Sequence, residues 1–247
     1  MVNKILVFVL WLALAISACA QTVVPVTSEP SHHLAISNEF VRVFKVKVAP
    51  HAETLYHQHD HDYVYVTIGD ADVDNILLHG QPVRMALKDG QVRFSKALLA
   101  HKAKNNGDQP FRNVTVEFLK GIGTPVCGLP GAQESCGIGP AWTGGVDGTS
   151  ETNSGYSQPV FRGSRMTLDE FTTKGGSEVP SDAVPQAPFL LIAVSSMKFR
   201  FVSQKGTQEL AAQPGDVFWN DEVLSSFGVL PPAAKFVIIS FAAAKTQ

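Results

Sequence analysis

The residues of this sequence best suited to metal chemistry are histidines, and they are concentrated in its first half. All eight histidines lie within the first 101 of 247 residues. The densest stretch is His57-Gln58-His59-Asp60-His61-Asp62-Tyr63. Because residues i and i+2 of a strand project from the same face, His57 and His59 are expected to point together. Imidazole pairs of this kind predict a site for a divalent metal ion, with Fe, Mn, Zn, Ni and Cu as candidates.

His101 is predicted to be the third ligand, from a facing strand. It comes after a strand that begins at Gly90 and before a strand expected at 111–119. Three histidines leave coordination positions open for water or a substrate. His61 shares strand parity with the first pair and is a candidate fourth partner, unless it lies in a loop. Tyr63 either hydrogen-bonds to a metal-bound water or fills the fold interior.

The elements that must position these histidines are short strands. Period-two alternation over 40–48 and a run of β-branched and aromatic residues over 63–68 predict two of them. Further strands are expected around 73–78, 82–87, 91–94 and 111–119, and again near 166, 189–194, 198–202 and 236–241. Turns separate them, and no long amphipathic helix interrupts the first half. This spacing is typical of an all-β sandwich or barrel.

An internal repeat divides the strands into two units. Gly90-Gln91-Val92-Arg93-Phe94 in the first half matches Gly215-Asp216-Val217-Phe218-Trp219 in the second. Residues 121–160 are rich in Gly, Pro, Ser and Thr and are interpreted as a linker or a long surface loop. The predicted domains are therefore 21–120 and 161–247, each close to a hundred residues.

These motifs resemble the cupin superfamily. Its first motif, G-x5-H-x-H-x3,4-E-x6-G, matches His57, His59 and Gly69, with Tyr63 in the glutamate position. Its second, G-x5-P-x-G-x2-H-x3-N, runs from Gly90 through His101 to Asn105, with the central P-x-G replaced. The resemblance implies two tandem cupin barrels, of the jelly-roll or double-stranded β-helix type. It also implies a three-histidine centre, because the usual glutamate ligand is absent.

The second unit lacks the histidines. Counting from Gly215 as His101 is counted from Gly90 leads to Ser226, and the H-x-H position falls near 181–182. The second barrel is therefore predicted to be a degenerate cupin domain. Among the other histidines, His32 and His33 are interpreted as a solvated pair on an extended lead-in, with a place over the barrel mouth as the alternative. His51 and His79 are expected to be exposed in turns.

Two functions follow from the resemblance. One is a metal-dependent, dioxygenase-like enzyme that acts on a small molecule. The alternative is a non-catalytic protein of the cell envelope that binds a metal or a small ligand. A structural protein with residual motifs is a third interpretation. The sequence does not specify the substrate, the metal or the oligomer, and the net charge of -2 without a basic cluster argues against nucleic acid as a partner.

The first twenty residues predict export. Lys4 precedes an apolar run and a small-residue exit, as in a signal peptide. Cleavage before Gln21 would give a free periplasmic or secreted protein, whereas a lipid on Cys19 would anchor it to a membrane. Cys127 and Cys136 then form an even pair in an exported chain, which favours a disulfide bond over two free thiols.

Overall fold

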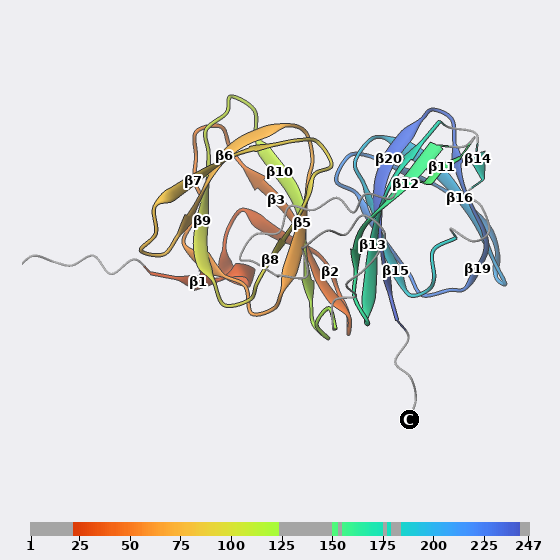
Figure 1. Cartoon of the computed structure of the whole chain (residues 1–247), viewed down its shortest axis with the longest axis horizontal. Helices are drawn as coiled ribbons and strands as arrows, with labels where there is room; N and C mark the ends of the chain where they lie inside the picture. Colours follow the sequence, from red (N-terminus) through yellow and green to blue (C-terminus); the bar gives the residue numbers. More distant parts are fainter. Residues whose placement is uncertain (1–21, 124–149, 153–154, 175–176, 179–183, 243–247) are drawn as a thin grey trace, which may run out of the picture.

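The structure is a computed structural model that describes residues 22–123, 150–152, 155–174, 177–178 and 184–242. It consists of two β-barrels side by side (Figure 1). The predicted leader 1–20 and the cysteine pair Cys127–Cys136 lie outside the described residues, so the export and disulfide predictions stay predictions. Within the described ranges, no helix has the length and apolar character needed to cross a membrane.

The first barrel has two five-stranded sheets, in the orders β1-β4-β9-β6-β7 and β2-β3-β10-β5-β8. A short 3-10 turn, η1 (Val26–Ser28), follows β1. The strands are β1 (Val24–Pro25), β2 (His32–Ser37), β3 (Val41–Val48), β4 (His57–Gln58), β5 (Tyr63–Thr67), β6 (Ala71–Leu77), β7 (Pro82–Leu87), β8 (Val92–Ser95), β9 (Ala100–Asn105) and β10 (Phe111–Phe118).

The second barrel repeats this arrangement, in the orders β11-β12-β13-β20-β15-β18 and β14-β19-β16-β17. Its strands are β11 (Ser150–Thr152), β12 (Gly155–Arg162), β13 (Met166–Thr173), β14 (Ser177–Glu178), β15 (Phe189–Ala193), β16 (Met197–Ser203), β17 (Gly206–Ala212), β18 (Val217–Asn220), β19 (Leu224–Leu230) and β20 (Ala234–Phe241). β12, β13, β20, β15 and β18 take the places of β2, β3, β10, β5 and β8, so the repeat seen in the sequence is a repeat of the whole fold.

Most predicted strands are present within a few residues of their expected bounds, but two segments differ. The lead-in of the first barrel contains β2, which pairs along β3. The segment assigned to the linker contains β11 and β12, so strand structure of the second barrel begins at Ser150 rather than at 161. Both segments are rich in polar or turn-forming residues, and strands of that composition give little hydrophobic alternation.

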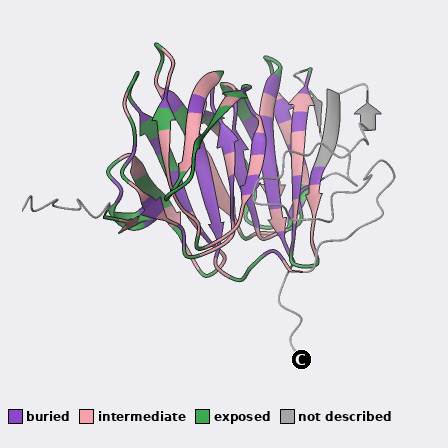
Figure 2. Ribbon diagram, turned by 60° about the vertical axis from the view of Figure 1, so that its left-hand side comes forward, coloured by how far each residue is buried: buried purple, intermediate pink, exposed green. Residues whose placement is uncertain are grey.

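The two barrels share one hydrophobic core where they meet. Alternate residues of β3, β5 and β10 point out of the first barrel toward the second, and these are valines: Val41, Val43, Val64, Val66, Val114 and Val116. They pack with Leu168, Leu190, Ile192, Val237 and Ile239 of β13, β15 and β20. Figure 2 shows buried stretches on the strands in the middle of the molecule. The sheet faces that would be solvated in a single barrel are therefore apolar.

Reciprocal polar contacts border this core. The Arg112 guanidinium, on the second residue of β10, donates to the carbonyl oxygen of Pro214 at 2.6 Å. Lys235, the second residue of β20, donates to the carbonyl oxygen of Asp89 at 2.9 Å. Gly90 follows Asp89 with φ +75°, and an added Cβ would lie 2.5 Å from the Lys235 ammonium. Each barrel thus holds the glycine turn of the other by equivalent residues.

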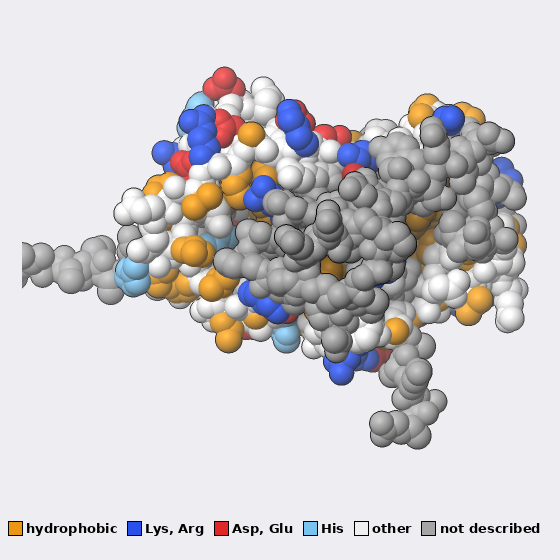
Figure 3. Space-filling model, viewed as in Figure 1, with side chains coloured by type: hydrophobic (Ala, Val, Ile, Leu, Met, Phe, Trp, Pro, Cys, Tyr) orange, Lys and Arg blue, Asp and Glu red, His pale blue; other side chains and the backbone are white. Residues whose placement is uncertain are grey.

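Charged side chains of both signs lie together on the part of the first barrel's surface that Figure 3 shows. In Figure 3, Lys, Arg, Asp and Glu side chains gather along the upper edge of the first barrel. Exposed side chains of opposite sign are paired on β6 and β7 and near them, as in Arg84–Asp72 and Lys88–Asp70.

Candidate metal centre

Histidines from separate parts of the chain meet inside the first barrel. One ring nitrogen from each of His32, His57 and His59 lies within 4.8 Å of the others. His57 and His59 are each 1% exposed, and the His32 side chain is 5% exposed. Among the described residues, this is the group of histidine, cysteine and acidic side chains close enough to hold a metal ion.

His101 borders the same cluster from the adjacent strand. β4 and β9 are antiparallel, and His57 lies directly opposite His101 in their register. The centroids of these two rings are 4.5 Å apart, and the His59 ring lies 5.9 Å from that of His101. The structure therefore groups His57 and His59 with His32, which was predicted to be solvated, and places the predicted third ligand, His101, beside this group rather than within it.

The N-terminal segment positions His32. β1 pairs in parallel with β4, so that Val24 lies beside His57. Val26 of η1 is buried in the barrel interior, and β2 then runs antiparallel to β3. Glu29, 3% exposed, accepts hydrogen bonds from the backbone amides of Ser31 and Leu55. The segment that precedes β3 therefore forms one wall of the site.

Each of the four histidines has a hydrogen-bond partner on its δ nitrogen. His32 Nδ1 lies 2.6 Å from a Glu29 carboxylate oxygen, and His59 Nδ1 lies 3.1 Å from Glu117 Oε1. The partner of His57 Nδ1 is the Leu55 carbonyl oxygen at 3.0 Å, and that of His101 Nδ1 is Asn75 Oδ1 at 2.8 Å. These acceptors fix the δ nitrogens as donors and leave the ε nitrogens as lone-pair donors, as in most metal-binding histidines.

The availability of an ε nitrogen for a metal ion is clearest at His57. Its Nε2 atom is buried and has no hydrogen-bond partner among the described residues. A buried polar atom without a partner is costly, and coordination of a cation would satisfy it. The donor set is entirely imidazole, which suits first-row transition ions. The residues present therefore fit a divalent metal ion.

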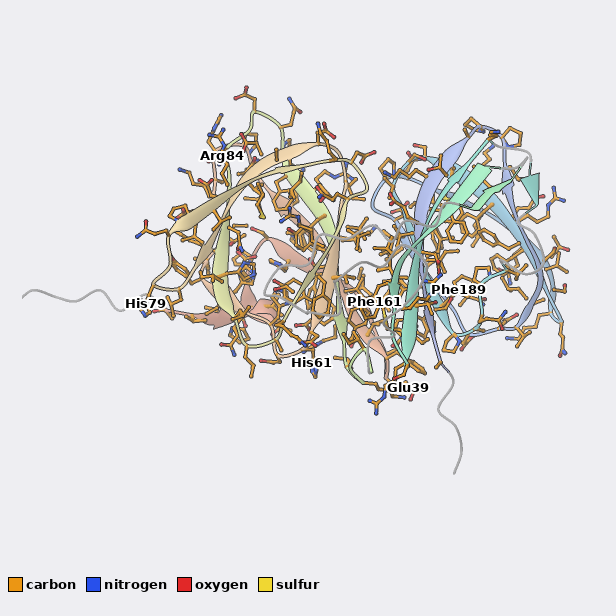
Figure 4. The ribbon with its side chains drawn as sticks, in the orientation of Figure 1. Glu39, His61, His79, Arg84, Phe161 and Phe189 are labelled. Carbon is orange, nitrogen blue, oxygen red and sulfur yellow. The ribbon has the colours of Figure 1, made fainter. Side chains whose placement is uncertain are left out.

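The two candidate fourth partners lie in different places. The Tyr63 ring stacks on His59 with centroids 3.9 Å apart, and its hydroxyl lies 3.3 Å from His101 Nε2. His61 is half-buried and is not among the residues that line the cavity beside the histidines. Figure 4 labels His61 at the lower edge of the first barrel, and His79 at its left-hand edge, away from the second barrel. Tyr63 thus both packs in the interior and makes a hydrogen bond.

Asn105, the last residue of the second cupin motif, has a structural role. It is fully buried, and its side-chain amide donates to the carbonyl oxygens of Val48, Ala49 and Gln109. Its Oδ1 atom accepts from the backbone amide of Gly107. Asn105 therefore joins the end of β9 to the end of β3 and holds the strand that carries His101.

Burial keeps His57, His59 and His101 uncharged at neutral pH. It lowers the pKa of His57 to about 4, with a further contribution from the nearby His32. Burial, together with neighbouring histidines, also holds the pKa values of His59 and His101 well below their usual range. Burial raises the pKa of Glu117, although the Arg42 guanidinium opposes this rise. Neutral imidazoles at pH 7 are the protonation state that a metal ion requires.

A pH-dependent stability follows for the protein kept in a chelator. Unfolded His57 takes up a proton near pH 6.5 but the folded residue only near pH 4. Its contribution to stability is therefore complete above pH 6.5 and is lost as the pH falls toward 4. This loss amounts to about 3 kcal/mol. Between pH 7 and pH 4, the free energy of unfolding measured in urea should fall by about 3 kcal/mol more in the wild type than in His57→Gln. Equal losses in the two proteins would contradict the assignment.

The histidines open onto a cavity of about 70 Å³ in the first barrel. Its wall is polar where β5, β8 and β10 face inward and apolar elsewhere. The inward residues are Tyr63, Tyr65, Arg93, Ser95, Asn113 and Thr115, and the apolar wall includes Val46, Val73, Met85, Phe94 and Phe111. At 10–15 Å³ per water-sized position, this volume holds about five water molecules or a small organic molecule.

The corresponding inward positions of the second barrel carry apolar side chains, although that barrel has its own cavity of about 410 Å³ lined in part by Arg162, Asp169 and Phe171. The strand registers match, because Tyr65 pairs with Thr115 and Arg93 as Leu191 pairs with Ile238 and Phe218. Its interior is a packed cluster in which Phe236 stacks on Phe171 with centroids 5.0 Å apart. Polar lining in the first barrel is thus replaced by apolar side chains at equivalent positions in the second.

The predicted counterpart of His101 needs a correction. His101 pairs with the last residue of β6, Leu77, whereas the last residue of β16, Ser203, pairs with Leu224. A register shift between β16 and β19 makes Leu224, rather than Ser226, the equivalent residue. Leu224 is buried in the apolar core of this barrel.

Comparison with known proteins identifies the fold. No protein-family model matches the sequence, and no curated protein matches it either. Solved structures do match. The cupin 2 conserved barrel domain protein from Leptotrichia buccalis has a TM-score of 0.54 at 7% identity, over 85% of this chain and 88% of the other. Salicylate 1,2-dioxygenase from Pseudoaminobacter salicylatoxidans has a TM-score of 0.53 at 11% identity, over 82% and 69%.

A third matching structure is that of Bacillus subtilis oxalate decarboxylase, a protein with Mn(II) centres. Its TM-score is 0.52 at 12% identity, over 84% of this chain and 71% of the other. Likenesses at these identities establish the fold. The chain is thus an all-β double barrel, and its fold is that of the two-barrel cupins, as the motifs predicted.

Proposed function

We propose that the first barrel binds a divalent metal ion through His57, His59 and His101, with His32 as an additional ligand, and uses it to transform a small molecule. The observation that carries the proposal is the buried, unpartnered Nε2 atom of His57, at the centre of four rings whose δ nitrogens are all engaged. Such an arrangement has no use in packing alone, because it leaves the ε nitrogen unsatisfied.

An enzyme is favoured over a purely binding protein by the cavity. A structural remnant would be expected to have apolar side chains at the inward positions, as the second barrel has at Leu191, Phe218 and Ile238. The first barrel instead keeps open volume lined by hydroxyl, amide and guanidinium groups beside the histidines. Matching folds include a dioxygenase and a decarboxylase with Mn(II) centres, so oxygen-dependent and decarboxylating reactions both belong in the search.

Different residues of the chain have different roles in the proposed metal site. A bound metal ion would supply Lewis acidity and open coordination positions for substrate. Glu29, Leu55, Asn75 and Glu117 orient the four imidazoles through their δ nitrogens. Tyr63 stacks on the His59 ring, and its hydroxyl, 3.3 Å from His101 Nε2, would release that nitrogen when a metal ion binds. Apolar side chains on the remaining wall exclude water.

The test is metal analysis of protein purified without an affinity tag, followed by turnover assays. The expected result is close to one divalent ion per chain, and consumption of oxygen or release of carbon dioxide with some member of a panel of small acids and phenols. Metal uptake without any turnover would support the non-catalytic alternative. Absence of metal uptake from every ion offered would contradict the proposal.

Export is a separate proposal, which rests on the sequence of residues 1–20 alone. Mass spectrometry of the mature N-terminus in the native host is expected to find Gln21, for a free periplasmic or secreted protein, or lipidated Cys19, for an anchored one. An intact Met1 would contradict it.

A further inference from the structure

Arg93 is a cation inside the cavity of the first barrel. It lies on β8 with the same inward parity as Ser95, opposite Tyr65 of β5. Its side chain lines the cavity that the histidines also line. A guanidinium stays charged at any accessible pH, so this position places a permanent positive charge beside the candidate metal centre.

The partners of this guanidinium leave it uncompensated. One terminal nitrogen donates to the Met85 sulfur at 2.9 Å, and thioether sulfur is a weak acceptor. Tyr65 accepts a hydrogen bond from Arg93, but burial raises the pKa of Tyr65 to about 12, so its hydroxyl carries no negative charge. The Arg93 Nε atom is buried and has no hydrogen-bond partner in the described part of the chain.

The nearby carboxylates are committed elsewhere. Glu117 lies 2.9 Å from the Arg42 guanidinium and 3.1 Å from His59. Glu29 accepts hydrogen bonds from His32 and from two backbone amides. Among the described residues no carboxylate lines the cavity, so a divalent ion held by imidazoles would add its charge to that of Arg93. Such a cavity requires a negative ligand.

We infer that Arg93 is the anion-binding group of this cavity and that the molecule bound beside the histidines carries a carboxylate. The cavity is small and partly apolar, which suits a compact organic acid. A guanidinium presents a planar fork that matches the two oxygens of a carboxylate. This inference names the substrate class of the proposed metal centre and rests on that proposal, but the role of Arg93 can be tested without metal.

The experiment compares acetate with acetamide, which has the same shape and no charge. Calorimetric titrations use wild type, Arg93→Met, Arg93→Lys and the control Arg84→Met, whose arginine is exposed and paired with Asp72. Each protein is studied both loaded with Mn(II) and treated with a chelator. Wild type and the control are expected to bind acetate at least tenfold more tightly than acetamide. Arg93→Met should lose that preference, and Arg93→Lys should retain part of it.

Metal content is measured on every sample, so the two ideas can fail separately. No Mn(II) uptake would contradict the metal proposal, while acetate selectivity that depends on Arg93 in the chelated protein would still support this inference. Equal binding of acetate and acetamide, or unchanged acetate affinity in Arg93→Met, would overturn it. Tighter binding of inorganic phosphate than of acetate would overturn the assignment to a carboxylate.

A stability measurement excludes a merely structural arginine. Because a partly buried charge without a counter-charge does not stabilise the fold, Arg93→Met is expected to melt at the same temperature as wild type or higher in the absence of acetate. Acetate should raise the melting temperature of the wild type and leave that of Arg93→Met unchanged. A marked fall in the melting temperature of Arg93→Met, with acetate affinity retained, would show that Arg93 serves the fold and would overturn the inference.

Discussion

His57→Ala is expected to abolish binding of divalent metal ions, with affinity reduced by more than a hundredfold. His57 is the central member of the cluster: its ring centroid lies 4.6 Å from that of His32, 5.4 Å from that of His59 and 4.5 Å from that of His101. Loss of partners that only orient ligands typically costs 10–100-fold, so loss of a central ligand should cost more. Equilibrium titration with Mn(II) and elemental analysis of the purified protein measure the effect.

His79→Ala is the matched control, because His79 is exposed in a turn of the same barrel. It should bind metal as the wild type does. Far-ultraviolet circular dichroism should show that His57→Ala keeps its β structure, since removal of the ring breaks one hydrogen bond, to the Leu55 carbonyl oxygen. A folded His57→Ala that retains wild-type affinity would refute the metal centre as described.

Phe236→Ala is expected to lower the free energy of unfolding by about 3–5 kcal/mol and to leave metal affinity unchanged. Phe236 is fully buried, stacks on Phe171 and lies 5.9 Å from the Phe227 ring. The substitution leaves a void in the second barrel. The surrounding strands are not expected to close it, because β20 is hydrogen-bonded to β13 on one side and to β15 on the other. Denaturant unfolding monitored by fluorescence gives the loss.

Val223→Ala serves as the comparison for this substitution, because Val223 is 78% exposed in the same barrel and should change stability very little. If Phe236→Ala costs less than about 1 kcal/mol, the packed interior inferred for the second barrel is wrong. If it also weakens metal binding, the two barrels are coupled more closely than their separate interiors suggest.

Strand periodicity predicted the fold well, because strands that bury valines on one face give a clear alternation. The repeat at Gly90 and Gly215 identified the duplication, because the turn before β8 and the turn before β18 both have a positive φ, which favours glycine. β2 and β12 were not predicted, because their sequences are rich in polar or turn-forming residues and show little hydrophobic alternation. Their pairing depends on residues distant in sequence.

The candidate site was only partly accessible from the sequence. His57, His59 and His101 stood out because two of them form an H-x-H pair and the third ends a strand. His32 lies outside these motifs and reaches the site only because β1 pairs with β4. Its acidic neighbour three residues earlier, Glu29, was the available signal, since a buried carboxylate commonly orients a metal-binding imidazole. Arg93 carries no motif, and only the fold reveals that it faces inward.

The apolar outer face of the first barrel also affects the order of events during synthesis. The strands that carry its valines are complete at Phe118, whereas β20, which covers them, ends at Phe241. At about 5–20 residues per second, roughly 120 further residues take about 6–25 s to synthesise. During that interval the valine face of a folded first barrel would be exposed, and exposed faces of this kind promote association between chains. The second barrel, whatever else it does, acts as the covering partner that ends this exposure.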